Sequence, residues 1–143
     1  LFIIMNNLSE NINKTFELLN NSYCPYSKFR VASSIITKDN DFFGGTNIEN
    51  ASYGLTMCAE RTAIFNMLSS GISKDNINYI IIVSDCSDKI IPCGACLQVF
   101  SEFLNENTKI YIACFNKLKG QQYKINEYKF KSLLPIAFNF DAK

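Results

Sequence analysis

Apolar residues near the start of the chain recur every three or four positions, as at Leu8, Ile12 and Phe16. This spacing places them on one face of a helix, because an α-helix has about 3.6 residues per turn. Ser9 belongs to the residue types that often cap a helix start. The pattern therefore predicts an amphipathic helix over residues 9–21.

The segment after this helix predicts a β-hairpin. Residues 29–37 are rich in β-branched side chains, residues 38–41 have turn chemistry, and residues 42–48 return to an extended pattern. Gly44 and Gly45 in the second strand suggest a bulge.

The rest of the chain alternates helical periodicity with short apolar runs that are typical of strands covered on both faces. Proline is well suited to the first turn of a helix, so we expect Pro92 to open one. In order, the pattern predicts a helix over 58–69, a strand over 78–84, a helix from 92 to 104, a strand over 109–115 and an edge strand over 123–130.

This order of elements predicts an α/β fold with three layers, in which a mixed sheet of about five strands has helices on both faces. The chain has 143 residues, of which 48% are hydrophobic, so it can bury one sizeable core and little more. We therefore predict a single domain over residues 1–143. Because a natural chain begins with Met, we expect residues 1–4 to be a non-native extension and Met5 to be the start.

The charge pattern argues against a polymeric nucleic acid as partner, because 14 basic and 13 acidic residues are scattered along the chain. No apolar run approaches the roughly 18 residues that span a membrane. The apolar start, residues 1–5, is too short for a secretion signal and lacks a basic lead. We expect a cytoplasmic protein without a membrane anchor, whose six cysteines stay reduced.

Histidine is absent from the chain, so any metal ion must be held by Cys, Asp or Glu. Three cysteines form a pattern, with Cys58 in Cys-Ala-Glu and with Cys93 and Cys96 in Pro-Cys-Gly-Ala-Cys. Both clusters lie at predicted helix starts, where unpaired amides stabilise a thiolate. Three thiolates leave the fourth tetrahedral position of zinc open, which is typical of a catalytic site.

The two residues after the Cys-Ala pair add acid–base chemistry and charge. Three thiolates donate strongly and reduce the acidity of zinc-bound water, so a nearby base is needed, and Glu60 is placed to supply it. Three thiolates also leave zinc with an excess negative charge. Arg61, one of only two arginines, is predicted to donate a hydrogen bond to a ligand sulfur.

Simpler interpretations of these residues exist. The Cys-x-x-Cys pair alone is also typical of a redox pair, and Glu60 alone is more typical of a solvated helix residue. A closed structural zinc site needs a fourth ligand, and Cys24, Cys86 and Cys114 do not lie in a matching pair. A disulfide framework does not suit a chain with this core and no secretion signal. The joint pattern favours a zinc hydrolase.

Beyond this pattern, the chain resembles the cytidine deaminase family, in the small form that assembles as a homotetramer. Deaminases that edit nucleic acids carry His as the first zinc ligand. Cys58 in that place favours the branch that acts on free nucleosides. The resemblance runs from about residue 9 to residue 138 and rests on CPYSKFRV, TNIENASY, CAERTA, PCGACLQV and LLPIAF.

The resemblance implies one Zn²⁺ per subunit and hydrolytic deamination of cytidine and deoxycytidine to uridine and deoxyuridine, with release of ammonia, in pyrimidine salvage. It implies ligand, catalytic or substrate-binding roles for a set of side chains. These are Cys58, Cys93 and Cys96 as ligands, Glu60 as proton shuttle, Arg61 as support, Asn47 and Glu49 at the 3′-hydroxyl of the sugar, Phe29 against the pyrimidine, Ala59 at the substrate, and Phe138 in the site of a neighbouring subunit.

Some of these residues also have plainer interpretations. Phe29 and Phe138 are equally typical of core or interface aromatics, and Asn47 of a turn. The alternatives at the level of function are deamination of another aminopyrimidine compound, such as an antibiotic nucleoside, and a zinc-binding module without catalysis.

The sequence departs from the family pattern in two places. Leu97 stands where relatives commonly have Arg, so we expect the charge balance at the thiolates to depend more on Arg61. Ala32 and Ser33 replace the usual Gly-Ala pair of the first strand.

Overall fold

A computed structural model describes residues 2–120 and 122–140, with side chains from Asn7 onward. Leu1, the first residue of the expected extension, lies outside this range. The helices and strands are α1 (Phe2–Glu17), β1 (Ala32–Thr37), β2 (Phe42–Thr46), α2 (Ala59–Ser69), β3 (Ile77–Ser84), α3 (Gly94–Ser101), β4 (Lys109–Cys114), β5 (Lys124–Lys129) and α4 (Phe130–Leu133).

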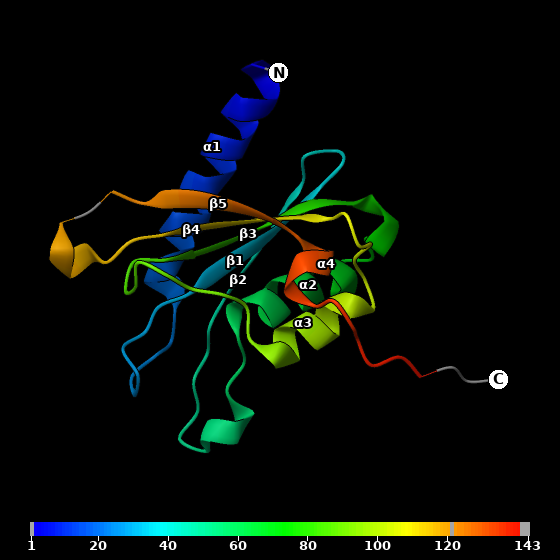
Figure 1. Ribbon diagram of the computed structural model, residues 1–143. Helices are drawn as coiled ribbons and strands as arrows, with labels where there is room; N and C mark the ends of the chain where they lie inside the picture. Colours follow the sequence, from blue (N-terminus) through cyan, green and yellow to red (C-terminus); the bar gives the residue numbers. More distant parts are fainter. Residues whose placement is uncertain (1, 121, 141–143) are drawn as a thin grey trace.

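One mixed sheet forms the middle layer of the fold, with strand order β2-β1-β3-β4-β5. β3 and β4 are parallel, and the other neighbouring strands are antiparallel. α1 covers one face of the sheet, and α2 and α3 cover the other (Figure 1). The predicted three-layer α/β fold with five strands is confirmed. Over the described residues, no helix combines the length and the apolar character needed to cross a bilayer.

The central strand β3 supplies side chains to both cores. Ile80 and Ile82 pack with α2 and α3, whereas Ile81 and Val83 pack with α1. Successive side chains of a strand point to opposite faces, so a strand between two helical layers must be apolar at every position. Each such fully buried side chain stabilises the fold by about 1.5–3 kcal/mol. This explains the continuous apolar run in the sequence.

The first helix begins earlier than the sequence pattern predicts. It runs over Phe2–Glu17 and continues as a 3₁₀ turn at Leu18–Asn21, instead of forming one α-helix over 9–21. The prediction of Ser9 as its cap is wrong, since Ser9 lies inside the helix. The preceding residues include no proline or glycine, so nothing in the sequence stops the helix from extending toward the N-terminus.

The first strand begins at Ala32, three residues later than predicted. Residues 29–31 lie outside the strand and follow Lys28, whose φ of 58° is left-handed. Their backbone is instead held by Asn47, whose N–H donates to the Val31 carbonyl oxygen at 3.1 Å. A pattern of β-branched residues does not reveal where the strand begins, because it does not show which backbone groups pair with one another.

The prediction of a bulge at Gly44 and Gly45 is wrong, because β1 pairs with β2 without a register shift from Ala32 to Ile36. The glycines serve close approach instead. A Cβ built on Gly44 would lie 2.4 Å from the side chain of Leu18.

Gly45 lets β2 lie directly against the backbone of α2. A Cβ at this position would lie 2.3 Å from the nitrogen of Ala63, 2.7 Å from the carbonyl carbon of Thr62 and 2.8 Å from the carbonyl oxygen of Ala59. Backbone atoms inside a helix cannot move aside singly, so any side chain here must displace the helix.

The third helix begins at Gly94 and ends at Ser101. Pro92 therefore lies before the helix, not in its first turn, and Cys93 occupies the N-cap position. The helix also ends three residues before the predicted residue 104. The terminal strand agrees with the prediction, since β5 is an edge strand of the sheet.

We predict that Gly45→Ala lowers the free energy of unfolding by about 1–3 kcal/mol, because the added methyl group must push α2 away from the sheet. The matched control is Gly54→Ala, where a Cβ meets nothing within 4 Å. That variant should change stability by less than about 0.5 kcal/mol. Urea unfolding of both variants tests this, and equal stabilities would contradict the close-packing argument.

Candidate active site

Three cysteines meet where α2 and α3 begin. Cys58 is the N-cap residue of α2, Cys93 is the N-cap residue of α3, and Cys96 lies in the first turn of α3. The Sγ atoms of Cys58 and Cys93 are 4.0 Å apart, those of Cys93 and Cys96 are 3.5 Å apart, and all three lie within 4.8 Å of one another. The predicted convergence of the two clusters is confirmed.

The chemistry of these donors fits zinc. A tetrahedral zinc ion with Zn–S distances of about 2.3 Å requires sulfur atoms about 3.8 Å apart. The observed Sγ separations of the three cysteines bracket this value. Along the described residues, no other group of three Cys, Asp or Glu side chains comes this close together. Three ligands leave one tetrahedral position open to solvent or substrate.

The cysteines differ in their readiness to ionise. The pKa of Cys58 is lowered to about 5, chiefly by hydrogen bonding from the neighbouring Cys96 thiol and also by Arg61. The pKa of Cys96 is raised, because its proton is held by the Cys58 sulfur and because the side chain is buried. The Cys96 thiol proton is therefore held toward the Cys58 thiolate. A metal ion must displace this proton to bind.

Arg61 lies beside the first ligand, as predicted. Its Nη2 donates a hydrogen bond to the Cys58 Sγ at 3.4 Å. Its Nε is buried and has no hydrogen-bond partner among the described residues. The other arginine, Arg30, is paired with Asp85 away from the sulfur atoms. Leu97, at the position where an arginine was expected from the family pattern, is buried in the apolar core between the sheet and α3.

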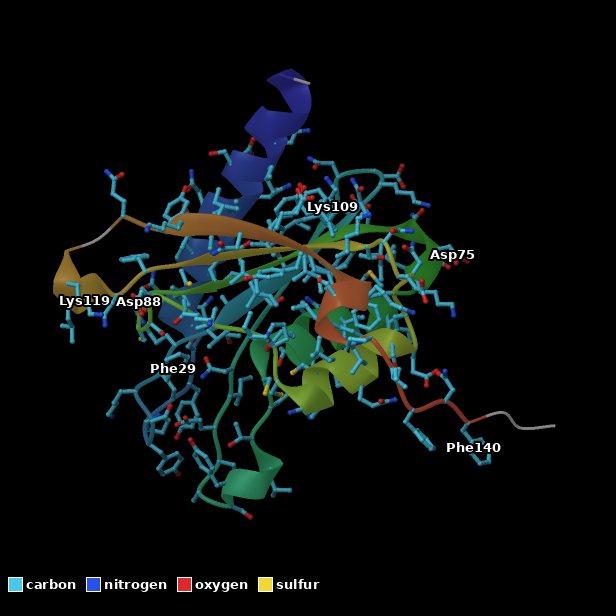
Figure 2. All side chains as sticks on the ribbon, in the orientation of Figure 1. Phe29, Asp75, Asp88, Lys109, Lys119 and Phe140 are labelled. Atoms are coloured by element: carbon cyan, nitrogen blue, oxygen red, sulfur yellow. The ribbon has the colours of Figure 1, made fainter. Side chains whose placement is uncertain are left out.

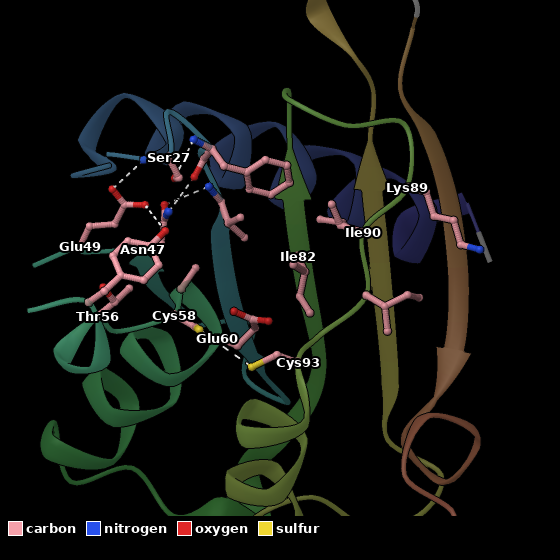
Figure 3. Close-up of a pocket in the computed structure, with 15 residues that line it drawn as sticks. Ser27, Asn47, Glu49, Thr56, Cys58, Glu60, Ile82, Lys89, Ile90 and Cys93 are labelled. Carbon is pink, nitrogen blue, oxygen red and sulfur yellow. Dashed lines mark hydrogen bonds between the residues drawn. The ribbon is translucent and has the colours of Figure 1, made fainter. Parts of the chain in front are cut away.

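Glu60 is a buried carboxyl group in the first turn of α2, with 6% of its surface exposed. Burial raises its pKa to about 7, and the nearby Cys58 sulfur adds to the shift. A carboxyl group with this pKa both accepts and donates protons near neutral pH. Figure 3 shows the group pointing into a cavity beside Cys93.

The cavity has a volume of about 580 Å³ and is lined by residues from both ends of the site. Asn47 and Glu49 lie toward its Ser27 end, and Glu60 lies beside Cys93 (Figure 3). Ala59 and the exposed ring of Phe29 form parts of its walls. Seven residues named from the sequence line it, namely Phe29, Asn47, Glu49, Cys58, Ala59, Glu60 and Cys93.

Glu49 is an ionised carboxylate at the cavity wall. Its Oε2 accepts hydrogen bonds from the backbone N–H groups of Tyr26 at 3.0 Å and Ser27 at 3.2 Å, and its Oε1 accepts one from the Tyr53 hydroxyl at 3.4 Å. Desolvation opposes ionisation, but these hydrogen bonds outweigh it and lower the pKa. Carboxylate oxygens offer about four acceptor sites, so Glu49 retains capacity for a ligand hydroxyl.

Asn47 holds the segment that carries Phe29. Its Oδ1 accepts a hydrogen bond from the Val31 N–H at 3.0 Å, and its Nδ2 donates one to the Phe29 carbonyl oxygen at 2.7 Å. Both ends of the side-chain amide therefore fix the backbone on either side of Arg30. One Nδ2 hydrogen is left over, because a primary amide has two.

Comparison with known proteins agrees with this geometry. The zinc-binding region of cytidine and deoxycytidylate deaminases matches residues 5–114. A cytidine deaminase of Halalkalibacterium halodurans is 41% identical over 127 residues, covering 89% of this chain and 90% of the relative. The chain belongs to the cytidine deaminase family. It is therefore an enzyme of the hydrolase class, as predicted.

Further relatives support the same family. A cytidine deaminase of Mycoplasma pneumoniae is 41% identical over 116 residues, covering 80% of this chain and 84% of the relative. The crystal structure of the cytidine deaminase from Burkholderia pseudomallei has a TM-score of 0.81 and 34% identity, covering 91% of this chain and 98% of that chain. The family match over residues 5–114 includes all three cysteines and Glu60.

Phe138, which the family resemblance places in the site of a neighbouring subunit, does not line the cavity of its own chain and is 70% exposed on the C-terminal segment. Sequence reasoning missed Ser27, Tyr53 and Ile90, which line the cavity. Ser27 and Tyr53 lie within motifs that carry the family resemblance, but only the structure shows that both donate hydrogen bonds to the Glu49 carboxylate.

We predict that Arg61→Gln weakens zinc binding by about 10–100-fold, because residues that hydrogen-bond to metal ligands contribute about this much to affinity. Competition with a chelator measures the affinity without relying on activity. Arg30→Gln is the matched control, since the Arg30 side chain is paired with Asp85 and not with any of the three clustered cysteines. Equal zinc affinities in the two variants would remove Arg61 from this account.

Proposed function

We propose that this chain catalyses the zinc-dependent hydrolytic deamination of free cytidine and deoxycytidine to uridine and deoxyuridine, with release of ammonia. The observation that carries the proposal is the buried Glu60 carboxyl group, with a pKa of about 7, beside the three cysteines. The relatives named as cytidine deaminases support the choice of nucleoside.

Cys58, Cys93 and Cys96 would hold one Zn²⁺ per subunit. When bound, the ion supplies Lewis-acid activation of water, which lowers the pKa of that water. The Arg61 guanidinium offsets part of the negative charge of the thiolates.

Glu60 moves the protons of the reaction. Its carboxylate takes a proton from the attacking water and delivers it to the ring nitrogen next to the amino-bearing carbon. A bond forms between that carbon and the water oxygen. Glu60 then passes the second proton of the water to the amino group, which leaves as ammonia as its bond to carbon breaks and the carbonyl group of uridine forms. A pKa near 7 suits this role, because the same group must act as base and then as acid.

The cavity walls orient the nucleoside. Phe29 supplies an aromatic face for the pyrimidine ring, and Ala59 forms a wall beside Glu60. The Glu49 carboxylate accepts a hydrogen bond from the 3′-hydroxyl of the sugar, and the remaining Nδ2 hydrogen of Asn47 is available to the same oxygen. A ligand that lacks this hydroxyl leaves the remaining acceptor site of the buried carboxylate unfilled, which disfavours its binding.

The proposal extends to assembly and physiology. The chain forms one domain and associates as a homotetramer, in which Phe138 of one copy reaches the cavity of another. Its exposure and its position outside its own cavity support this. Sedimentation of the active enzyme measures the number of subunits. The reaction then serves pyrimidine salvage in the cytoplasm.

We predict that Glu60→Gln lowers kcat for cytidine by about 10²–10⁴-fold, because the amide cannot carry protons between water, ring and leaving group. Zinc content should stay the same, since the side chain is not a ligand. Ammonia release and metal analysis of the purified variant measure both quantities. Glu17→Gln, at an exposed position in the last turn of α1, is the control and should retain full activity. Undiminished turnover in Glu60→Gln would overturn the proposed role.

We predict that the wild-type enzyme discriminates against 3′-deoxycytidine and that Glu49→Gln reduces this discrimination. A hydrogen bond to a charged acceptor contributes about 1.5–3 kcal/mol, so kcat/KM for cytidine should fall by about 10–100-fold in the variant. The value for 3′-deoxycytidine should change little, since that substrate lacks the hydroxyl. Equal losses for both substrates would show that Glu49 only shapes the cavity.

A further inference from the structure

The C-terminal segment exposes large apolar side chains. Residues 135–140 follow α4 without regular secondary structure, and they include Ile136 at 90%, Phe138 at 70% and Phe140 at 81% exposure. The segment leaves α4, passes α3 and extends away from the body of the fold, with Phe140 near its end (Figures 1 and 2). Three exposed apolar side chains in six residues favour burial against another surface.

This segment is nevertheless attached to the fold at one residue. The Gln98 side chain donates a hydrogen bond from Nε2 to the Phe138 carbonyl oxygen at 2.9 Å and accepts one at Oε1 from the Phe138 N–H at 3.3 Å. Among the described residues, no other side chain or backbone group is hydrogen-bonded to residues 135–140. The carboxamide thus pairs with both backbone groups of one residue, as a neighbouring β-strand does.

The Gln98 carboxamide is itself held in place. Its Nε2 also donates to the Ser101 hydroxyl oxygen at 3.3 Å, and that hydroxyl donates to the Gln98 carbonyl oxygen at 2.6 Å. Gln98 lies two residues after Cys96, which is about 200° around the helix. The side chain therefore leaves α3 on the face opposite the zinc ligand, and its role is separable from metal binding.

An exposed aromatic pair lies beside the cavity. Tyr53, which lines the cavity, forms an edge-to-face pair with Tyr26, with ring centroids 6.4 Å apart, and both are more than half exposed in the single chain. The Tyr26–Tyr53 pair and residues 135–140 are thus both exposed in the single chain. In an oligomer of this chain, each copy carries both surfaces.

We propose that Gln98 is a positioning residue, which fixes the backbone of Phe138 so that its ring is aimed at the cavity of a second copy. The inference rests on the proposed function, since it assigns Phe138 to a neighbouring substrate site. Pairing with both the N–H and the carbonyl oxygen restricts the backbone on each side of the ring. Less conformational freedom is then lost when the ring docks, so the substrate binds more tightly.

The first test separates attachment from activity. Gln98→Met keeps the length of the side chain and removes both hydrogen bonds, and Gln122→Met makes the same change at an exposed position in the β4–β5 connection. In Gln98→Met, hydrogen-exchange mass spectrometry should show faster exchange in the C-terminal peptide. The KM for cytidine should rise about 3–30-fold, with kcat within about twofold and zinc content unchanged; Gln122→Met should match the wild type on every measure.

A double-mutant cycle then asks whether Gln98 acts through Phe138. Phe138→Ala should raise KM to a similar extent, and the double variant should be no worse than Phe138→Ala alone. Additive effects, unchanged exchange, or unchanged KM in Gln98→Met would each overturn the proposal.

Mixed oligomers test the action between copies. Phe138→Ala chains, which keep an intact cavity, are combined with Glu60→Gln chains, which keep an intact C-terminal segment. The low KM should return in these mixtures, but not when the second chain also carries Gln98→Met. Equal rescue by both partners would overturn the role of Gln98. If the unmodified enzyme did not deaminate cytidine, the proposed function would fail, whereas the exchange measurement would still report on the attachment.

Discussion

The meeting of two helix starts at three sulfur atoms is the constraint on which this molecule depends. Cys58 and Cys93 are N-cap residues of α2 and α3, and their Sγ atoms lie 4.0 Å apart. Helix N-termini carry partial positive charge, which stabilises the thiolates that a metal ion requires. The position of α2 depends in turn on Gly45, because any side chain there would meet the helix backbone. A packing contact in the core therefore helps to place Cys58 beside Cys93 and Cys96.

The same packing creates the acid–base chemistry. Glu60 lies in the first turn of α2, where burial raises its pKa to about 7. A carboxyl group on the exposed face of the same helix would remain ionised at neutral pH. The placement of one helix thus sets both the spacing of the sulfur atoms and the proton affinity of the neighbouring base.

The proposed substrate contacts have a different origin, since they lie in irregular segments. Glu49 and Asn47 follow β2, and they hold the backbone that precedes β1 through hydrogen bonds to Ser27 and Val31. The segment with Phe29 is therefore positioned by the residues that we propose to bind the sugar. The C-terminal segment depends on a similar device, as Gln98 pairs with the backbone of Phe138. In each case a polar side chain replaces the partner that a strand would have provided.

Local patterns determined much of this protein from the sequence alone. Alternating helical and strand periodicity predicts the three-layer sheet, and Cys-Ala-Glu with Pro-Cys-Gly-Ala-Cys at helix starts predicts the ligand cluster and its neighbouring carboxyl group, because periodicity and capping are properties of short segments. The tertiary structure decided the rest. It shows that Gly44 and Gly45 serve close packing and not a bulge, that Asn47 clamps the Phe29 segment, and that Tyr53 contacts Glu49. These features arise from contacts between residues far apart in the chain, and the burial that shifts the pKa of Glu60 arises from such contacts too, so no local pattern could reveal them.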